Sequence, residues 1–402
     1  MGTIINEEDI IKTFQPNEQR LAKQYALAWK TKEREEEKAF YNYDKAKKLY
    51  KVGYTIKEIA EKLRVHKSTV YWWVVKNARP RVGAKKLAQI TRIPQSNING
   101  WFYGTNRFGK KPKPRLLHTI DALKKKNLLP LRLNMNQKIR WLARVCGFMF
   151  GDGYLGGKLD KFKLSGDIDS LKQLKKGFLK HTREEGKITI KRKTGFIEGR
   201  QITGTSTDLE LGSCVLARYL NALGVPKGNK TIAKFEFPYW VKRNKEVLRE
   251  FCRGLLWTEL SAPKISKGTS FGAVRFSMTK RRFVKEHILF LEEIRSELHK
   301  FGIETTPIKE FKKDHFGFHI KNNGLNMLKL YEELPPIYCK DKERTFKKAV
   351  EKLKEMRKIT SYNDFLKKQE EKVKQYHKVM ELRDMHGWSD SELPGAKAPS
   401  VS

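Results

Sequence analysis

Two acidic residues stand 107 positions apart, each at the end of a similar apolar segment. Asp152 follows LARVCGFMFG (142–151), and Glu259 follows GLLWT (254–258). Paired carboxylates in a basic chain favour a divalent cation, because Mg²⁺ prefers hard oxygen ligands and bridges to phosphate oxygens. The alternative is that each acid only caps or ion-pairs the end of a helix. The same kind of acid after the same kind of segment, twice, favours the metal site.

The segments before the two acids predict helices that pack closely against each other. Ala143, Gly147 and Gly151 recur every four residues, and a shift of 107 residues aligns Gly147 with Gly254. Glycine costs about 1 kcal/mol per helical position relative to alanine, so a packing reason is expected. We therefore expect the two helix backbones to approach along a pseudo-twofold axis, which brings both carboxylates to one end of the seam.

At these positions the sequence resembles the LAGLIDADG homing endonucleases. The two motifs are LARVCGFMFGDGYL (142–155) and EFCRGLLWTELSAPK (250–264). Between them, LNALGVPKGNKT (220–231) and FPYW (237–240) are also similar to the family. The resemblance extends over residues 138–345.

The resemblance implies a duplicated fold and a metal-dependent nuclease site. It implies the α+β class, with two αββαββα halves, 138–235 and 236–345, that form a pseudo-twofold monomer with antiparallel DNA-binding sheets. It also implies that the acids hold Mg²⁺ or Mn²⁺. The site residues that it implies are Asp152 and Glu259 as catalytic and metal-binding acids, Gly151 and Thr258 at the metal, and Lys230 and Lys340 near the scissile phosphates.

Leu260 departs from the motif and keeps more than one function open. It stands where glycine normally follows the second acid, and we expect its side chain to crowd the metal or the phosphate. The candidate functions are a site-specific double-strand DNA endonuclease, a non-cleaving DNA-binding transcriptional regulator of the same fold, and an RNA maturase. Both acids favour the endonuclease, whereas Leu260 favours the regulator. An intein host is disfavoured, because the chain opens with Met1 and lacks a terminal His-Asn.

Alternating sequence after each acid predicts β-strands with one basic or polar face. The segments KFKL (161–164), KITIKRK (187–193) and AVRFSMTK (273–280) show this alternation, and FKKDHFGFHI (311–320) predicts one more strand. Successive side chains of a strand point to opposite faces, so the basic ones line the side that meets DNA. The DNA contacts predicted here are Lys161, Lys163, Lys191, Arg192, Lys193, Arg275 and Lys280.

Residues 53–80 and 81–103 predict two small helix-turn-helix units. In the first, two apolar stripes at helical spacing are separated by a break at Arg64, where such turns commonly carry glycine. A shift of 28 residues aligns Ala60 with Ala88 and Trp73 with Trp101. The second unit is therefore a more divergent copy of the first, and paired units of this kind favour a regulator. The predicted DNA contacts are Lys67, Ser68, Tyr71, Trp72 and Asn97, although asparagine is equally common in caps.

The remaining segments predict helices and a basic linker. Residues 1–52 predict an N-terminal helical segment, and residues 346–402 predict a C-terminal helix followed by a disordered tail. Residues 104–137 are rich in Gly, Pro and Lys, and Lys110 and Lys111 are predicted to contact DNA phosphates from this linker.

Composition indicates the class of partner. The 402 residues include 85 Lys and Arg against 45 Asp and Glu, a net charge of +40. A heat-adapted surface explains many charges but not their imbalance, so we expect double-stranded DNA as the partner. No apolar stretch approaches the roughly 18 residues of a membrane span, so no membrane partner is expected. Four cysteines without a CxxC pair disfavour zinc and disulfides. We expect a cytoplasmic, nucleoid-associated protein that acts as a monomer.

Overall fold

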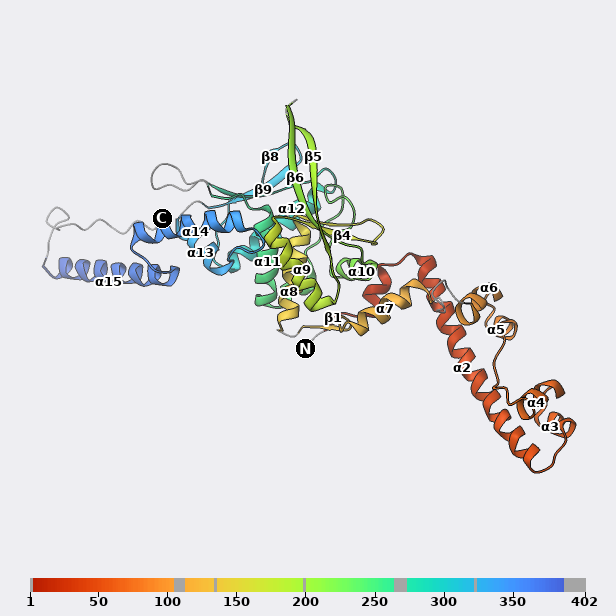
Figure 1. Cartoon of the computed structure of the whole chain (residues 1–402). Helices are drawn as coiled ribbons and strands as arrows, with labels where there is room; N and C mark the ends of the chain where they lie inside the picture. Colours follow the sequence, from red (N-terminus) through yellow and green to blue (C-terminus); the bar gives the residue numbers. More distant parts are fainter. Residues whose placement is uncertain are drawn as a thin grey trace. The chain divides into compact units, whose positions relative to one another are not determined.

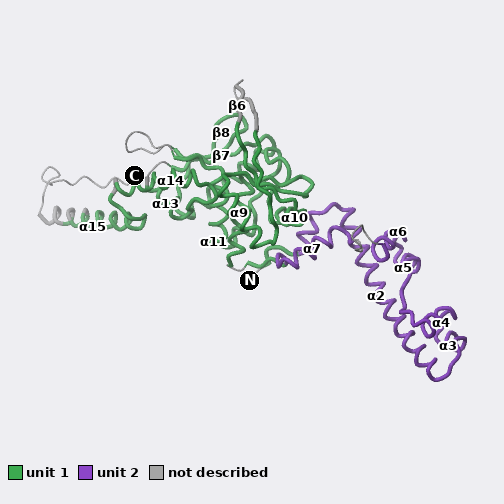
Figure 2. Tube along the Cα trace, in the orientation of Figure 1, with its two compact units in different colours: residues 1–6, 130–402 green, residues 7–129 purple. Residues whose placement is uncertain are grey.

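The computed structural model divides into two compact units. It describes residues 3–104, 113–133, 136–197, 200–263, 273–321 and 324–386 (Figure 1). One unit is formed by residues 7–129, and the other by residues 1–6 and 130–402 (Figure 2). We call them the helical unit and the core unit.

The helical unit is built on one long helix. Its elements are α1 (Glu7–Lys12), α2 (Pro16–Lys51), α3 (Ile56–Leu63), α4 (Lys67–Val74), α5 (Ala84–Thr91), α6 (Gln95–Ile98), the π-helical turn η1 (Asn99–Tyr103) and α7 (Arg115–Lys125). Pro16 opens α2, where its missing N–H would have no helical partner anyway. The Glu18 carboxylate accepts the backbone N–H of Gln15 at 3.1 Å and so satisfies a donor at the helix start.

Helices α3 and α4 form the first helical pair. The backbone N–H of Thr55 donates to Glu58 at 2.8 Å, and the Glu58 N–H donates to Thr55 Oγ1 at 3.3 Å, so a capping box starts α3. Arg64 ends α3 with a left-handed φ of 53°, at the position where glycine is common. The pair buries Ile59, Ala60, Val70 and Trp73 against α2.

Helix α5 and the continuous segment α6–η1 form the second helical pair. Arg92, 28 positions after Arg64, also ends its helix with a left-handed φ, of 57°. Leu87 and Ile98 are fully buried. Phe102 is buried in place of the predicted Trp101, because a π-helical turn takes in one residue more than an α-helical turn and moves the next side chain to the core.

The first half of the core unit alternates helices and antiparallel strands. Its elements are α8 (Gln137–Phe150), β3 (Gly153–Leu155), β4 (Phe162–Ser165), α9 (Ile168–Thr182), β5 (Lys187–Ile197), β6 (Arg200–Leu211) and α10 (Cys214–Ala222). The sheet has the strand order β3-β4-β6-β5. Lys163 of β4 lies opposite Glu210 of β6, which in turn lies opposite Lys187 of β5.

The second half has a similar order of elements. They are η2 (Tyr239–Arg243), α11 (Lys245–Glu259), β7 (Val274–Thr279), α12 (Val284–Lys300), β8 (Lys309–Lys312), β9 (His315–Ile320) and α13 (Gly324–Glu333). The sheet has the order β7-β9-β8. The predicted strand 311–320 is thus part of a hairpin: Asp314, with a left-handed φ of 63°, turns the chain between β8 and β9.

The α+β class is confirmed, and the first half has the predicted order αββαββα. Among the described residues of the second half, only β7 lies between α11 and α12. Leu260 forms an isolated bridge to Phe276 of β7, where the first half has β3 paired with β4. The complete duplication therefore stays a prediction.

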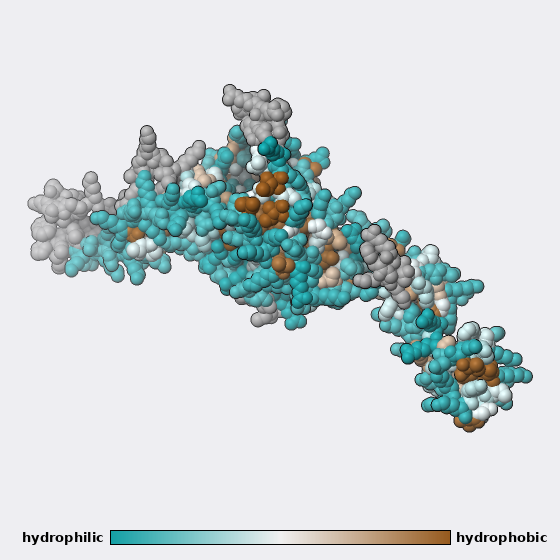
Figure 3. All heavy atoms as spheres, viewed as in Figure 1, coloured by the Kyte–Doolittle hydropathy of each residue, from teal (hydrophilic) through white to brown (hydrophobic). Residues whose placement is uncertain are grey.

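The ends of the core unit are short strands and helices. Strand β1 (Thr3–Ile5) pairs with β2 (Leu131–Arg132), and α14 (Lys340–Arg357) and α15 (Tyr362–His386) follow α13. None of the described helices is both long enough and apolar enough to span a membrane. Hydrophobic side chains form only small patches on the largely hydrophilic face drawn in Figure 3.

Candidate active site at the ends of helices α8 and α11

Helices α8 and α11 touch through their backbones at two glycines. A Cβ atom on Gly147 would overlap the carbonyl oxygen of Phe251, and one on Gly254 would overlap the carbonyl oxygen of Arg144. The two contacts are reciprocal, since Gly254 lies 107 positions after Gly147 and Phe251 lies 107 positions after Arg144. The close, near-twofold seam that the glycine spacing predicted is therefore present.

The two acids lie where this seam ends. A Cβ atom on Gly151 would overlap the side chain of Thr258 and lie 3.1 Å from Glu259 Oε1. Burial raises the pKa of Glu259 to about 7, and the nearby charge of Asp152 raises this pKa as well. Desolvation also raises the pKa of Asp152, although one side of its carboxylate faces solvent. Two carboxylates that disfavour each other's charge in this way favour a cation close by.

One lysine binds the end of each of the two helices. Lys230 Nζ donates to the carbonyl oxygens of Phe150, at 3.1 Å, and of Gly151. Lys342 Nζ donates to the two carbonyl oxygens that lie 107 positions further along the chain, at 3.0 Å each. The positive charges of both lysines lower the pKa values of Asp152 and Glu259. The near-twofold relation of the helices thus extends to the groups that neutralise their ends.

The structure moves one predicted site residue by two positions. Lys340, predicted to lie near the scissile phosphate, instead forms an exposed ion pair with Asp169, with 2.7 Å between Nζ and Oδ2. Lys342 takes the expected place. Both lysines lie in the first turn of α14, and side chains two residues apart point about 200° apart around a helix. Lys340 therefore cannot reach the site that Lys342 reaches.

Lys280 was predicted to contact DNA but is fully buried. Its Nζ donates to the carbonyl oxygens of Lys230, at 2.9 Å, and of Ala233, and lies 3.9 Å from the centre of the Phe235 ring. Burial lowers the pKa of Lys280 to about 8. Lys280 thus holds the turn that carries Lys230 and is not available to a phosphate.

The predicted cations of the first sheet fall into two groups. Lys163 and Lys191 both donate to Glu210 Oε1 at 2.7 Å, and these bonds lower the pKa of Glu210 to about 2. Lys161 and Arg192 are exposed. Of the other predicted contacts, Lys193 lies in β5, Arg275 is half-buried with its guanidinium 5.0 Å from the Phe311 ring, and Lys110 and Lys111 lie outside the described residues.

The predicted contacts of the first helical pair are all exposed, and those of the second need a correction. Lys67, Ser68, Tyr71 and Trp72 project from α4, although Ser68 also caps the helix with its Oγ 2.7 Å from His66 Nδ1. In the second pair Asn97 is half-buried, whereas Gln95 and Asn99 are exposed. The 28-residue shift places these two opposite Lys67 and Tyr71, so the shift itself could have found them.

Leu260 does not lie exposed beside the acids. Its side chain is 1% exposed, and its backbone pairs with Phe276. It occupies the hydrophobic core, which removes the expected reason for it to crowd a metal or phosphate.

Comparisons with known proteins place similarity in both units. A family model described as "Putative ATPase subunit of terminase (gpP-like)" matches residues 41–93, which include α3, α4 and α5. The DNA-directed RNA polymerase subunit Rpo1N of Methanocaldococcus jannaschii is 34% identical over 196 residues, 46% of this chain and 14% of that protein. The tRNA-splicing ligase RtcB of Pyrococcus abyssi is 29% identical over 268 residues, 59% of this chain and 28% of that protein. The chain spans 11% to 28% of the length of the first of these relatives, so their named activities are not carried over.

Similar solved structures include a homing endonuclease and a LAGLIDADG domain. The complex of I-DmoI with DNA and Mn shares 16% identity with a TM-score of 0.32, and covers 50% of this chain and 98% of that one. Full-length DUF199/WhiA from Thermatoga maritima shares 13% identity with a TM-score of 0.35, and covers 61% of this chain and 71% of that one. TM-scores this low do not by themselves establish a shared fold.

Proposed function

We propose that this chain is a site-specific double-strand DNA endonuclease of the LAGLIDADG type. The observation that supports the proposal is the near-twofold site, in which Asp152 and Glu259 lie where the seam of α8 and α11 ends. Each helix end also holds one lysine on an equivalent pair of carbonyl oxygens. Two equivalent half-sites suit a duplex, whose two scissile phosphates are themselves related by a twofold axis.

The donors at this site fit a hard divalent cation. Carboxylate oxygens with raised pKa values gain most from a cation nearby, and Mg²⁺ or Mn²⁺ prefers such ligands. Asp152 and Glu259 would hold it together with the carbonyl groups of Gly151 and Thr258. When bound, it supplies polarisation of the phosphate and a more acidic water. Among the described residues, no three His, Cys, Asp or Glu side chains are grouped to hold a metal, so carbonyl and phosphate oxygens complete this coordination.

The chain's own cations prepare the site for a phosphate. At neutral pH Glu259 is only partly ionised, since its pKa is about 7. The ammonium groups of Lys230 and Lys342 favour its ionised form and place positive charge beside both carboxylates. Exposed Lys161 and Arg192 on the first sheet then provide contacts to the duplex backbone. One chain supplies both half-sites, so the proposed active form is a monomer.

Cleavage in the presence of Mg²⁺ tests the proposal. The full chain is incubated with a library of supercoiled plasmids that includes the flanking sequence of its own gene. Wild type should cut both strands at one site, whereas Asp152→Asn and Glu259→Gln should lower the single-turnover rate at least about 100-fold with DNA affinity nearly unchanged. Lys340→Ala is the matched control, because its ammonium is bound to Asp169 away from the site. Equal loss of binding and cleavage in the acid variants would contradict a catalytic role.

A non-cleaving DNA-binding regulator is the second candidate function. It is favoured by Thr258, whose side chain fills the space beside Gly151 where the first half has only a glycine backbone. Selective binding without cutting, with Mg²⁺, Mn²⁺ or Ca²⁺, would support this candidate and reject the endonuclease.

A further inference from the structure

The two helical pairs are copies of one motif. Helices α3 and α5 have the same length and start 28 residues apart, and α4 and α6 also start 28 residues apart. Arg64 and Arg92 end the first helix of each pair in the left-handed conformation. That conformation costs a non-glycine residue roughly 1–2 kcal/mol, so its repetition at equivalent positions indicates the same turn in both pairs.

Both copies dock on the same face of α2. The first pair packs on Tyr43 and Ala46, and the second on Tyr25 and Ala28. The two docking sites are 18 residues apart, which equals five full helical turns and a separation of about 27 Å along the helix axis. The rings repeat the pattern: Tyr43 lies 6.2 Å from Trp73, and Tyr25 lies 5.4 Å from Phe102.

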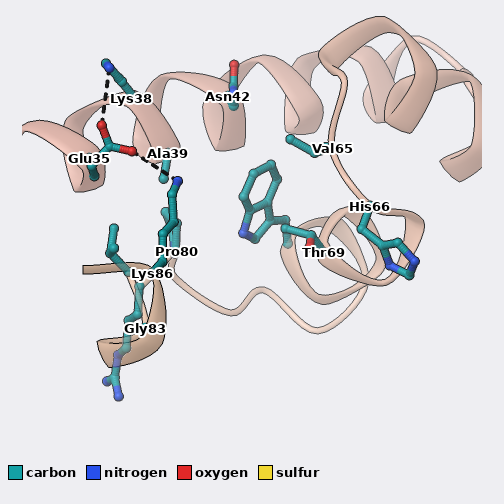
Figure 4. A pocket seen from close by; sticks show the side chains of 13 residues that line it. Glu35, Lys38, Ala39, Asn42, Val65, His66, Thr69, Pro80, Gly83 and Lys86 are labelled. Atoms are coloured by element: carbon teal, nitrogen blue, oxygen red, sulfur yellow. Dashed lines mark hydrogen bonds and ion pairs between the residues drawn. The ribbon is translucent and has the colours of Figure 1, made fainter. Parts of the chain in front are cut away.

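The connection between the pairs is fastened to α2 as well. Tyr43 donates its hydroxyl to Asn77 Oδ1 at 2.9 Å, just after α4. Midway along α2, Glu35 pairs with Lys38 and with Lys86 of α5, the latter at 3.0 Å (Figure 4). These residues border a cavity of about 440 Å³ that is floored by α2 and lies between the two pairs. The distance between the pairs is therefore set by a helix and not by a flexible linker.

Each pair exposes polar or aromatic side chains from its second helix. The first pair presents Lys67, Tyr71 and Trp72, and the second presents Gln95 and Asn99. Residues 53–103 contain ten Lys and Arg against two Glu. This combination of net positive charge with exposed base-contacting side chains suits a nucleic acid duplex.

We propose that the helical unit holds two DNA-reading heads at a fixed spacing, and that its ligand is a duplex with two subsites at one constant separation. The proposal deepens the proposed function and rests on its DNA-binding part. The 27 Å between docking sites corresponds to about 8 base pairs at 3.4 Å per base pair. The two heads thus read neighbouring segments within about one turn of the duplex.

Selection of bound sequences from random 60-base-pair duplexes tests the spacing. The full chain should enrich sequences with two blocks at one separation. Lys67→Ala/Trp72→Ala should erase one block and Gln95→Ala/Asn99→Ala the other, each with roughly 10- to 100-fold weaker binding to the selected duplex. All four side chains are exposed, so folding should not change. Leu27→Ala/Lys30→Ala, also exposed on α2, is the matched control and should behave as wild type.

Each outcome of the selection decides between fixed heads and other arrangements. Inserting five base pairs between the blocks should reduce affinity to that of a single block, because a rigid spacer cannot follow. A single block, blocks at variable separation, or enrichment that neither double variant alters would overturn the fixed-spacing proposal. If the wild type retains no duplex, the proposed function fails with it. If it retains two-block duplexes without cutting them, only the cleavage proposal fails.

Discussion

At the scale of single residues, three buried or half-buried lysines organise the candidate site. Lys230 and Lys342 bind equivalent carbonyl oxygens at the ends of α8 and α11. Lys280 in turn binds the carbonyl oxygens of Lys230 and Ala233. A lysine that satisfies two otherwise buried acceptors stabilises the turn, and this turn decides where the Lys230 ammonium lies.

Lys280→Met therefore predicts a loss of both stability and site order. The methionine fills a similar volume but leaves two carbonyl oxygens without their donor, which should cost about 1–3 kcal/mol of unfolding free energy. The displaced Lys230 should lower the cleavage rate constant more than DNA affinity. Thermal unfolding and single-turnover cleavage measure the two effects. Lys285→Met, at an exposed position of α12, is the control; an equal effect there would contradict the positioning role of Lys280.

The pKa of Lys280 adds a pH dependence with a definite sign. Burial holds it near 8 in the folded chain, below its ordinary value of 10.5. The folded state then binds fewer protons than the unfolded state between about pH 8 and 10.5, so this group makes the chain more stable as pH rises through that window. Lys280→Met removes that rise.

Sequence patterns pointed to the acids and to Lys230, but not to the other two lysines of the site. The spacing of Gly147 and Gly254 is a backbone property that shows directly in the sequence, and it predicted the seam. Lys342 does not follow Lys230 at the same 107-residue spacing, because the connections after α10 and after α13 differ in length. Lys280 sits in an alternating segment that predicts an outward basic residue, and only its tertiary neighbours reveal that it points inward.

At the scale of elements, the seam of α8 and α11 determines the distance between the two acids. Gly147 and Gly254 allow each helix to lie against a carbonyl oxygen of the other. Any side chain at these positions separates the helices and with them Asp152 and Glu259.

Gly147→Ala should destabilise the core unit despite the better helix propensity of alanine. The propensity gain is about 1 kcal/mol, whereas the overlap with the Phe251 carbonyl forces backbone shifts that typically cost about 1–3 kcal/mol or more. We expect a net loss of stability, and Gly254→Ala should match it because its contact is reciprocal. Urea unfolding of the full chain measures the loss. Gly212→Ala has no atom within 4 Å of its new Cβ and serves as the control; an unchanged Gly147→Ala would contradict the backbone contact.

At the scale of the whole molecule, both units carry a large share of the positive charge. Residues 7–129 contain 29 Lys and Arg against 12 Asp and Glu, and the rest of the chain contains 56 against 33. Such charge on both units favours phosphate contacts from each of them, whatever their arrangement. The division of labour that we propose is base reading by the helical unit and chemistry by the core unit.

Replacing residues 7–129 by a short Gly-Ser linker separates these two roles. The replacement keeps Thr3–Ile5, which pairs as β1 with β2 of the core unit. Binding should weaken, and the slope of log affinity against log salt should become shallower by roughly 0.9 for each phosphate that the shortened chain no longer neutralises. The cleavage rate at saturating protein should remain, because both acids and both lysines lie outside the replaced segment. Mobility shifts between low and high salt and single-turnover cleavage provide the two readouts. An unchanged slope would show that the helical unit does not bind DNA, and an inactive shortened chain at saturation would show that the chemistry depends on it.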